Sequence, residues 1–116
     1  MQVRLSPGSW GRASFFHSNS PPGAVFTIAD TLALGVLKVF KNTGMQVPEQ
    51  VALASLDDIS IAGLVDPGLT TVALPARKLG LEAIKMLQHL VDGREPAEKQ
   101  IVLPTALVVR QSCGCP

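Results

Sequence analysis

Acidic side chains follow two apolar segments of the sequence, at the positions where buried strands are expected to end. Asp30 comes shortly after residues 24–28, and Asp57 with Asp58 directly follows residues 51–56. Carboxylates accept charge-assisted hydrogen bonds from hydroxyl groups, and such bonds are stronger than those between neutral groups. A few polar groups of this kind give a small-molecule site its specificity. The pattern therefore favours binding of a small polyhydroxylated molecule.

Each of these residues also has an interpretation that involves no ligand. Asp30 suits the N-cap or the first turn of a helix, because a carboxylate there faces free backbone N–H groups. Asp57 and Asp58 are equally typical of the start of a solvated loop. Leu56 and Leu74, at the ends of apolar segments, fit a core as well as a pocket wall. Both interpretations stay open at this point.

Motifs that would indicate an enzyme are absent from the sequence. It contains no glycine-rich phosphate loop, no Gly-x-Ser-x-Gly elbow and no His-Glu-x-x-His pair. The Asp57–Asp58 pair is similar to the acidic pocket of a receiver domain, but no phosphoacceptor aspartate or strand-end lysine accompanies it. Cys113 and Cys115 lack the further ligands of a zinc site and are expected to be exposed thiols. We predict neither catalysis nor a metal or cofactor site.

Composition and charge restrict the remaining classes of protein. The chain has 116 residues, of which 47% are hydrophobic and 16% charged, and this balance indicates one globular domain. The net charge is +1 with scattered basic residues, whereas nucleic-acid-binding domains usually present a basic face. Residues 1–12 lack the apolar centre of a signal peptide, and no segment is long enough to span a membrane. We expect a cytoplasmic protein that contacts no membrane.

The apolar periodicity predicts strands that alternate with helices. Strands are expected over 24–28, 51–56, 69–74, 100–103 and 106–109, long helices from Asp30 to a terminating Gly44 and over 75–91, and one or two helical turns within 59–65. This order predicts an α/β fold with a mostly parallel sheet, flanking helices and right-handed crossovers. Ligands of such sheets bind outside the carboxyl ends of the strands. Asp30 and Asp57 are therefore expected to face a common crevice. Leu74, at the end of the third expected strand, is expected to face the same crevice.

The apolar surfaces of these elements exceed what the chain can cover by itself. Residues 24–28 are uniformly apolar, which is typical of a strand buried on both faces. The helix over 75–91 carries an apolar stripe: Ala76, Leu79, Ala83, Met86, Leu87 and Leu90. Two long helices are too few to cover both faces of a sheet, so we expect a fragment or an obligate partner. The first strand is also expected to expose an unpaired edge.

Several short segments, taken in order, resemble motifs of the LacI/GalR transcription regulators. Six segments each resemble one family motif: residues 21–26 resemble PPTAVFA, 29–35 NDxMALG, 44–52 GLRVPEDVSV, 56–59 FDDI, 66–72 PPLTTV, and 103–112 LPPELVVRES. Each motif is short, but their common order and spacing over residues 21–112 make the resemblance specific.

The resemblance implies a two-lobed effector domain that is similar to periplasmic sugar-binding proteins and is preceded by a helix-turn-helix and a hinge helix. Residues 21–112 would supply most of the C-terminal lobe, an incomplete periplasmic-binding-protein-like domain, after an irregular segment 1–20 and before a tail 113–116. It also implies a sugar or nucleobase effector at Asp30 and Asp57. DNA would be contacted only through a headpiece that this chain lacks.

The resemblance further implies a homodimer, or pairing with a full-length relative, through residues after Asp57: Ile59, Ile61, Leu64 and Val65. The sequence departs from the family where the effector is expected to lie. Ala29 replaces an asparagine, Leu56 an aromatic residue and Leu74 a glutamine, so the predicted pocket is more apolar than a typical sugar site. A solute-binding protein of transport and a small α/β enzyme stay open as alternatives.

Overall fold

The computed structural model describes residues 22–116, so the irregular segment expected over 1–20 lies outside the described residues. Within residues 22–116, four strands, two long helices and two 3-10 turns follow one another. Their bounds are β1 Ala24–Phe26, α1 Asp30–Thr43, β2 Ala52–Asp57, η2 Ser60–Gly63, β3 Thr70–Ala73, α2 Ala76–Val91, β4 Ala106–Val108 and η3 Gln111–Cys113.

The strands form one sheet in the order β1-β2-β3-β4. β1, β2 and β3 are parallel, with Ala24 opposite Ala52 and Asp57 opposite Ala73, and β4 returns antiparallel to β3. This confirms the predicted α/β fold with a mostly parallel sheet. Because parallel strands end at the same edge of a sheet, the carboxyl ends of β1, β2 and β3 lie together.

Helix α1 begins and ends as its sequence predicts. It starts at Asp30 and is followed by Gly44, whose φ of 74° lies in the left-handed region that glycine adopts without strain. The Gly44 N–H donates to the Lys41 carbonyl oxygen, and the Met45 N–H donates to that of Phe40. Ala33 and Phe40 are buried on the face that turns toward the sheet. The predicted C-terminal glycine is confirmed.

The core lies between α1, β2 and the turn η2. Ala33, Leu53, Ala62 and Leu69 are fully buried and form its centre. Alternate residues of β2 are buried, because successive side chains of a strand point to opposite faces. Ala62 belongs to η2, so the turn after the two aspartates is packed into the core.

The structure corrects two predictions about the strands. β1 is not buried on both faces: it lies at one edge of the sheet of described residues, and Phe26 is 62% exposed. Residues 100–103 do not form a strand. Ala73 pairs with Ala106, so the residues before Ala106 would have to pair with Pro75 and the start of α2, which offer no strand.

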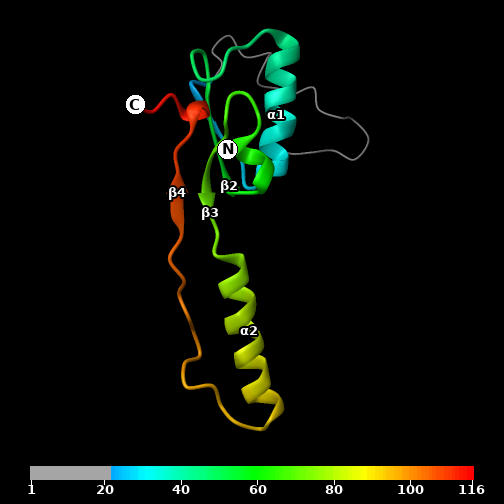
Figure 1. Cartoon of the computed structure of the whole chain (residues 1–116), viewed down its shortest axis with the longest axis vertical. Helices are drawn as coiled ribbons and strands as arrows, with labels where there is room; N and C mark the ends of the chain where they lie inside the picture. The colour runs from blue at the N-terminus through cyan, green and yellow to red at the C-terminus, as the bar shows by residue number, and fades with distance from the viewer. Residues whose placement is uncertain (1–21) are drawn as a thin grey trace.

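Helix α2 extends away from the sheet and gives the molecule its elongated shape of 59 × 36 × 21 Å (Figure 1). None of its residues is buried against the described chain, and Leu79, Leu87 and Leu90 of its apolar stripe are each more than half exposed. Such a face requires cover from outside the described residues. Neither α1 nor α2, the long helices of residues 22–116, is long and apolar enough to cross a membrane.

Candidate functional site

Asp57, the last residue of β2, and Asp58 directly after it have unusual backbone conformations. Asp57 has a φ of 119° and Asp58 a φ of 54°, and positive values are uncommon for residues other than glycine. Aspartate tolerates the left-handed region better than most residues, which accounts for the type of side chain found here. A backbone of this kind persists only where the surrounding structure holds it, and it is frequent at ligand sites.

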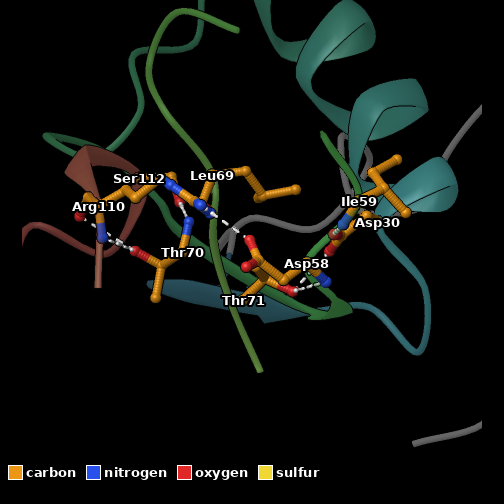
Figure 2. Close-up of polar contacts among 8 residues, drawn as sticks. All are labelled: Asp30, Asp58, Ile59, Leu69, Thr70, Thr71, Arg110 and Ser112. Atoms are coloured by element: carbon orange, nitrogen blue, oxygen red, sulfur yellow. Dashed lines mark hydrogen bonds and ion pairs between the residues drawn. The ribbon is translucent and has the colours of Figure 1, made fainter. Parts of the chain in front are cut away.

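Asp30 holds this strand end from the side of α1. Its carboxylate is fully buried and accepts a hydrogen bond from the Ile59 backbone N–H at 2.9 Å and from the Thr71 hydroxyl at 2.7 Å (Figure 2). Both partners are donors, which suits a carboxylate acceptor. Asp30 is a first-turn residue, and Ala29 occupies the N-cap without a side-chain bond. One buried side chain thus joins α1, β3 and the loop after β2.

Arg110 holds the same loop from the C-terminal segment. Its guanidinium donates to Asp58 Oδ1 at 2.8 Å and to the Leu69 carbonyl oxygen at 2.8 Å (Figure 2). The Thr70 hydroxyl donates to the Arg110 carbonyl oxygen at 3.0 Å and accepts from its backbone N–H at 2.9 Å. The Asp58–Arg110 pair is about a quarter exposed on each side, so solvent weakens it without abolishing it.

Ser112 fixes the C-terminal segment to the middle of the sheet. Its buried hydroxyl accepts from the Thr70 backbone N–H at 2.8 Å and donates to the Leu53 carbonyl oxygen at 2.6 Å. Arg110 and Ser112 lie within a segment that resembles a family motif, but their positions in the sequence indicate no particular role. The sequence signal that could have indicated these anchoring roles was an arginine and a serine that follow an apolar strand. Thr71 was missed as well, because its partner Asp30 lies far away in sequence.

Asp57 differs from the other two aspartates of the strand ends. It is half-buried, yet no residue within 22–116 makes a hydrogen bond or ion pair with its carboxylate. No unpartnered side-chain oxygen in this part of the chain is buried, so the Asp57 oxygens are open to solvent. The structure therefore separates two internally bonded carboxylates, on Asp30 and Asp58, from a free one at the end of β2.

The other predicted ligand residues lie at the same edge of the sheet. Ala29 is half-buried and directly precedes Asp30, and Leu56 is half-buried within β2. Leu74 follows Ala73, the residue opposite Asp57, and is 38% exposed. The strand ends thus combine a free carboxylate with small and apolar side chains, an arrangement that can accept hydroxyl groups and cover the apolar face of a ligand.

The residues predicted for a dimer interface fall into two pairs. Ile59 and Val65 are half-buried and pack against the core. Ile61 is 45% exposed and Leu64 is 82% exposed on η2 and the residue after it. A partner could contact Ile61 and Leu64, whereas Ile59 and Val65 mainly support the turn.

One other polar feature of the described residues lies elsewhere. A surface hollow at the far end of α2 is lined by Lys85, Gln88, His89, Asp92 and Arg94. It lies away from the strand ends (Figure 1), so it is separate from the Asp57 site. Within residues 22–116, no cluster of three or more histidine, cysteine, aspartate or glutamate side chains is arranged to hold a metal ion.

The parallel sheet with free polar groups at its strand ends is the arrangement of a periplasmic-binding-protein-like domain, and residues 4–113 match the family of that description. The chain belongs to this family. Within it, the relatives are regulators: the transcriptional repressor MelR of Bacillus subtilis is 38% identical over 94 residues, which is 81% of this chain and 27% of that protein. The chain is therefore a segment of a LacI/GalR-type effector domain and spans 27% of that curated relative.

Solved structures agree with this assignment. A putative LacI-type transcriptional regulator from Bacillus cereus subsp. cytotoxis superposes with a TM-score of 0.80 at 32% identity, covering 85% of this chain and 35% of that one. A LacI family regulator from Arthrobacter sp. FB24, solved in complex with lactose, superposes with a TM-score of 0.73 at 32% identity, covering 87% of this chain and 38% of that one.

Proposed function

We propose that this chain is the part of a LacI/GalR-type regulator that contacts a small polyhydroxylated effector, and that Asp57 accepts the effector's hydroxyl groups. The observation that carries the proposal is the free carboxylate of Asp57 at the end of β2, beside two carboxylates that are bonded within the chain. A free carboxylate is available for charge-assisted bonds to hydroxyl groups. The lactose complex of the Arthrobacter relative supports a sugar as the class of effector.

Asp30 and Asp58 act in this proposal as positioning residues. Asp30 binds the Ile59 N–H, and Asp58 binds Arg110, so the residues on the C-terminal side of Asp57 are fixed. A group that is held before binding costs less entropy to engage, which is the advantage of preorganisation. Effector contact was expected at Asp30 as well, and we assign Asp30 a positioning role because both of its oxygens accept hydrogen bonds within the chain.

Ala29, Leu56 and Leu74 form the small and apolar part of the proposed site. Apolar side chains beside a few polar groups are typical of ligand pockets, which bury most of the ligand surface. The absence of amide and aromatic side chains at these positions favours an effector with an apolar face over a fully hydrated monosaccharide. A second lobe from outside the described residues would close the site.

The remaining activities belong to the whole regulator. Effector binding would shift the equilibrium between open and closed lobes, and a dimer would pass this shift to the DNA-binding headpieces. Of the four residues predicted for the interface, Ile61 and Leu64 are the exposed ones, and they would contact a partner, either a second copy or a full-length relative. We place such a regulator in the cytoplasm, where it binds DNA through its headpiece and catalyses no reaction.

The test is a titration of the ¹⁵N-labelled chain with lactose, cellobiose and ribose, followed by amide chemical shifts. A half-enclosed site should bind in the range of about 1–10 mM. We expect saturable shifts of the amides of Leu56, Asp57 and Leu74. Asp57→Asn should weaken binding by about 10- to 150-fold, since a bond to a charged group contributes about 1.5–3 kcal/mol.

The matched control is Glu49→Gln, which neutralises an exposed carboxylate far from the strand ends and should bind as the wild type does. Two outcomes would contradict the proposal. One is the absence of saturable shifts with every sugar. The other is equal affinity of the wild type and Asp57→Asn, which would move the contact away from Asp57.

A further inference from the structure

The sequence ends with two cysteines in a tight turn that the effector site does not use. Cys113 is the last residue of η3, and Gly114 follows with a φ of 64°. A Cβ on Gly114 would lie 3.1 Å from Pro48 Cβ, a tight contact, and the positive φ favours glycine at this position. The Cys115 backbone N–H donates to Cys113 Sγ at 3.2 Å, and the Cys115 thiol lies 4.0 Å from the Cys113 carbonyl oxygen. The turn therefore places the two cysteine side chains next to each other.

We propose that Cys113 and Cys115 form a thiol–disulfide exchange site, which takes a small disulfide of the glutathione class and closes to an intramolecular disulfide. The sequence contains no other cysteine. Cys115 is exposed and Cys113 is partly exposed, so a small disulfide in solution can reach both. Residues in a tight turn have the short Cα separation that a disulfide needs.

The surroundings give the two thiols different roles. Hydrogen bonding with the Cys115 side chain, and after it with the Thr70 side chain, lowers the pKa of the Cys113 thiol. The same bond with Cys113 raises the pKa of the Cys115 thiol. Since the thiolate is the nucleophile, Cys113 is the attacking residue and Cys115 the resolving residue.

The exchange proceeds in two balanced steps. The Cys113 thiolate attacks one sulfur of the small disulfide, whose S–S bond breaks, and the leaving thiolate takes a proton from water. The Cys115 thiol then loses its proton to water and attacks Cys113 Sγ, which expels the second small thiol. The two cysteines are oxidised to a disulfide, and the small disulfide is reduced to two thiols.

The position of the pair links its redox state to the segment that anchors the strand ends. The Cys113 thiol donates to the Arg110 carbonyl oxygen at 3.4 Å, and Cys113 follows the buried Ser112. Oxidation removes the thiol hydrogen and therefore this bond. The amides of Arg110 and Ser112 should consequently change their chemical shifts when the disulfide forms, whereas those of α2 should not.

The experiment incubates the full chain at low concentration with excess glutathione disulfide, quenches samples with acid and measures the intact mass. The wild type should pass through one glutathione adduct and end as a monomer that has lost two hydrogen atoms. Cys115→Ser should stop at a stable adduct on Cys113. In the wild type, the first adduct should lie on Cys113, which fragment mass spectrometry of the earliest acid-quenched samples can locate, because the Cys113 thiol has the lower pKa while both thiols are present.

Several results would overturn the proposal: a wild type that stays reduced, one that ends as a stable glutathione adduct, or one that forms disulfide-linked dimers. A first adduct on Cys115 in the wild type would overturn the assignment of roles. Circular dichroism of both proteins checks that folding is unchanged. The substitution does not touch the Asp57 site, so failure here is distinguishable from failure of the proposed effector function.

Discussion

Replacement of Asp30 by alanine is expected to destabilise the fold by about 3–5 kcal/mol. Its buried carboxylate accepts two hydrogen bonds, from the Ile59 N–H and the Thr71 hydroxyl, and each bond to a charged group contributes about 1.5–3 kcal/mol. Alanine leaves both donors without their acceptor in a buried place. The loss is large against the total of about 5–15 kcal/mol that is usual for a domain.

The isosteric variant Asp30→Asn separates the hydrogen bonds from the shape of the side chain. Its one carbonyl oxygen accepts from only one of the two donors, and its amide group faces the other. Thr71 can rotate its hydroxyl to accept from that amide, whereas the Ile59 N–H cannot change its role. We expect a loss of about 1–3 kcal/mol, between wild type and alanine.

The measurement is urea unfolding followed by far-ultraviolet circular dichroism, with linear extrapolation to water. Asp66→Asn is the control, because Asp66 is exposed and has no bond to another described residue, and it should change stability by less than about 0.5 kcal/mol. A loss below that value for Asp30→Ala would refute the reasoning. Should the alanine variant not fold, the asparagine variant and faster hydrogen exchange of the Ile59 amide decide the question.

Further predictions concern the C-terminal anchor, α2 and the thiols. Ser112→Ala should cost about 1–3 kcal/mol in urea unfolding, because the Thr70 N–H and the Leu53 carbonyl oxygen lose a buried partner; a cost near zero would refute that anchor. Leu87→Lys should leave stability within about 0.5 kcal/mol but reduce binding of a hydrophobic dye, since Leu87 is 59% exposed; unchanged dye binding would contradict this. In the wild type, limited alkylation followed by fragment mass spectrometry should modify Cys113 at lower pH than Cys115, because the pKa of the Cys113 thiol is lowered and that of the Cys115 thiol is raised; coincident pH profiles of the two thiols would contradict it.

Much of the fold was predictable because its signals are local. The alternation of apolar strands with amphipathic helices gave the order of elements, and Gly44 marked the end of α1 through its left-handed backbone. The shared edge for the strand ends followed from parallel pairing alone. The prediction of a strand at 100–103 was wrong. An apolar run indicates only a propensity for strand, whereas a strand in a sheet also needs a neighbour to pair with. β3 ends at Ala73, so residues 100–103 have no such neighbour.

The sequence did not predict which aspartates are bonded within the chain and which one is free, because this depends on residues that are distant in sequence. An aspartate that starts a helix looks the same whether it binds a ligand or holds the fold. The deciding partner of Asp30 is Thr71, 41 positions along the chain, and that of Asp58 is Arg110, 52 positions along. The apolar stripe of α2 likewise indicated burial without indicating the surface that covers it.

The backbone at Asp57 gives these anchors a function beyond stability. Positive φ values at Asp57 and Asp58 cost of order 1–3 kcal/mol each, and such a conformation relaxes unless neighbouring bonds outweigh it. The bonds from Asp30 to Ile59 and from Asp58 to Arg110 directly follow the strained residues and are of comparable size. The free carboxylate of Asp57 is therefore held in place by side chains that no effector needs to touch. Variants at Asp30 should then weaken effector binding although Asp30 does not touch the effector, because they release the loop that positions Asp57.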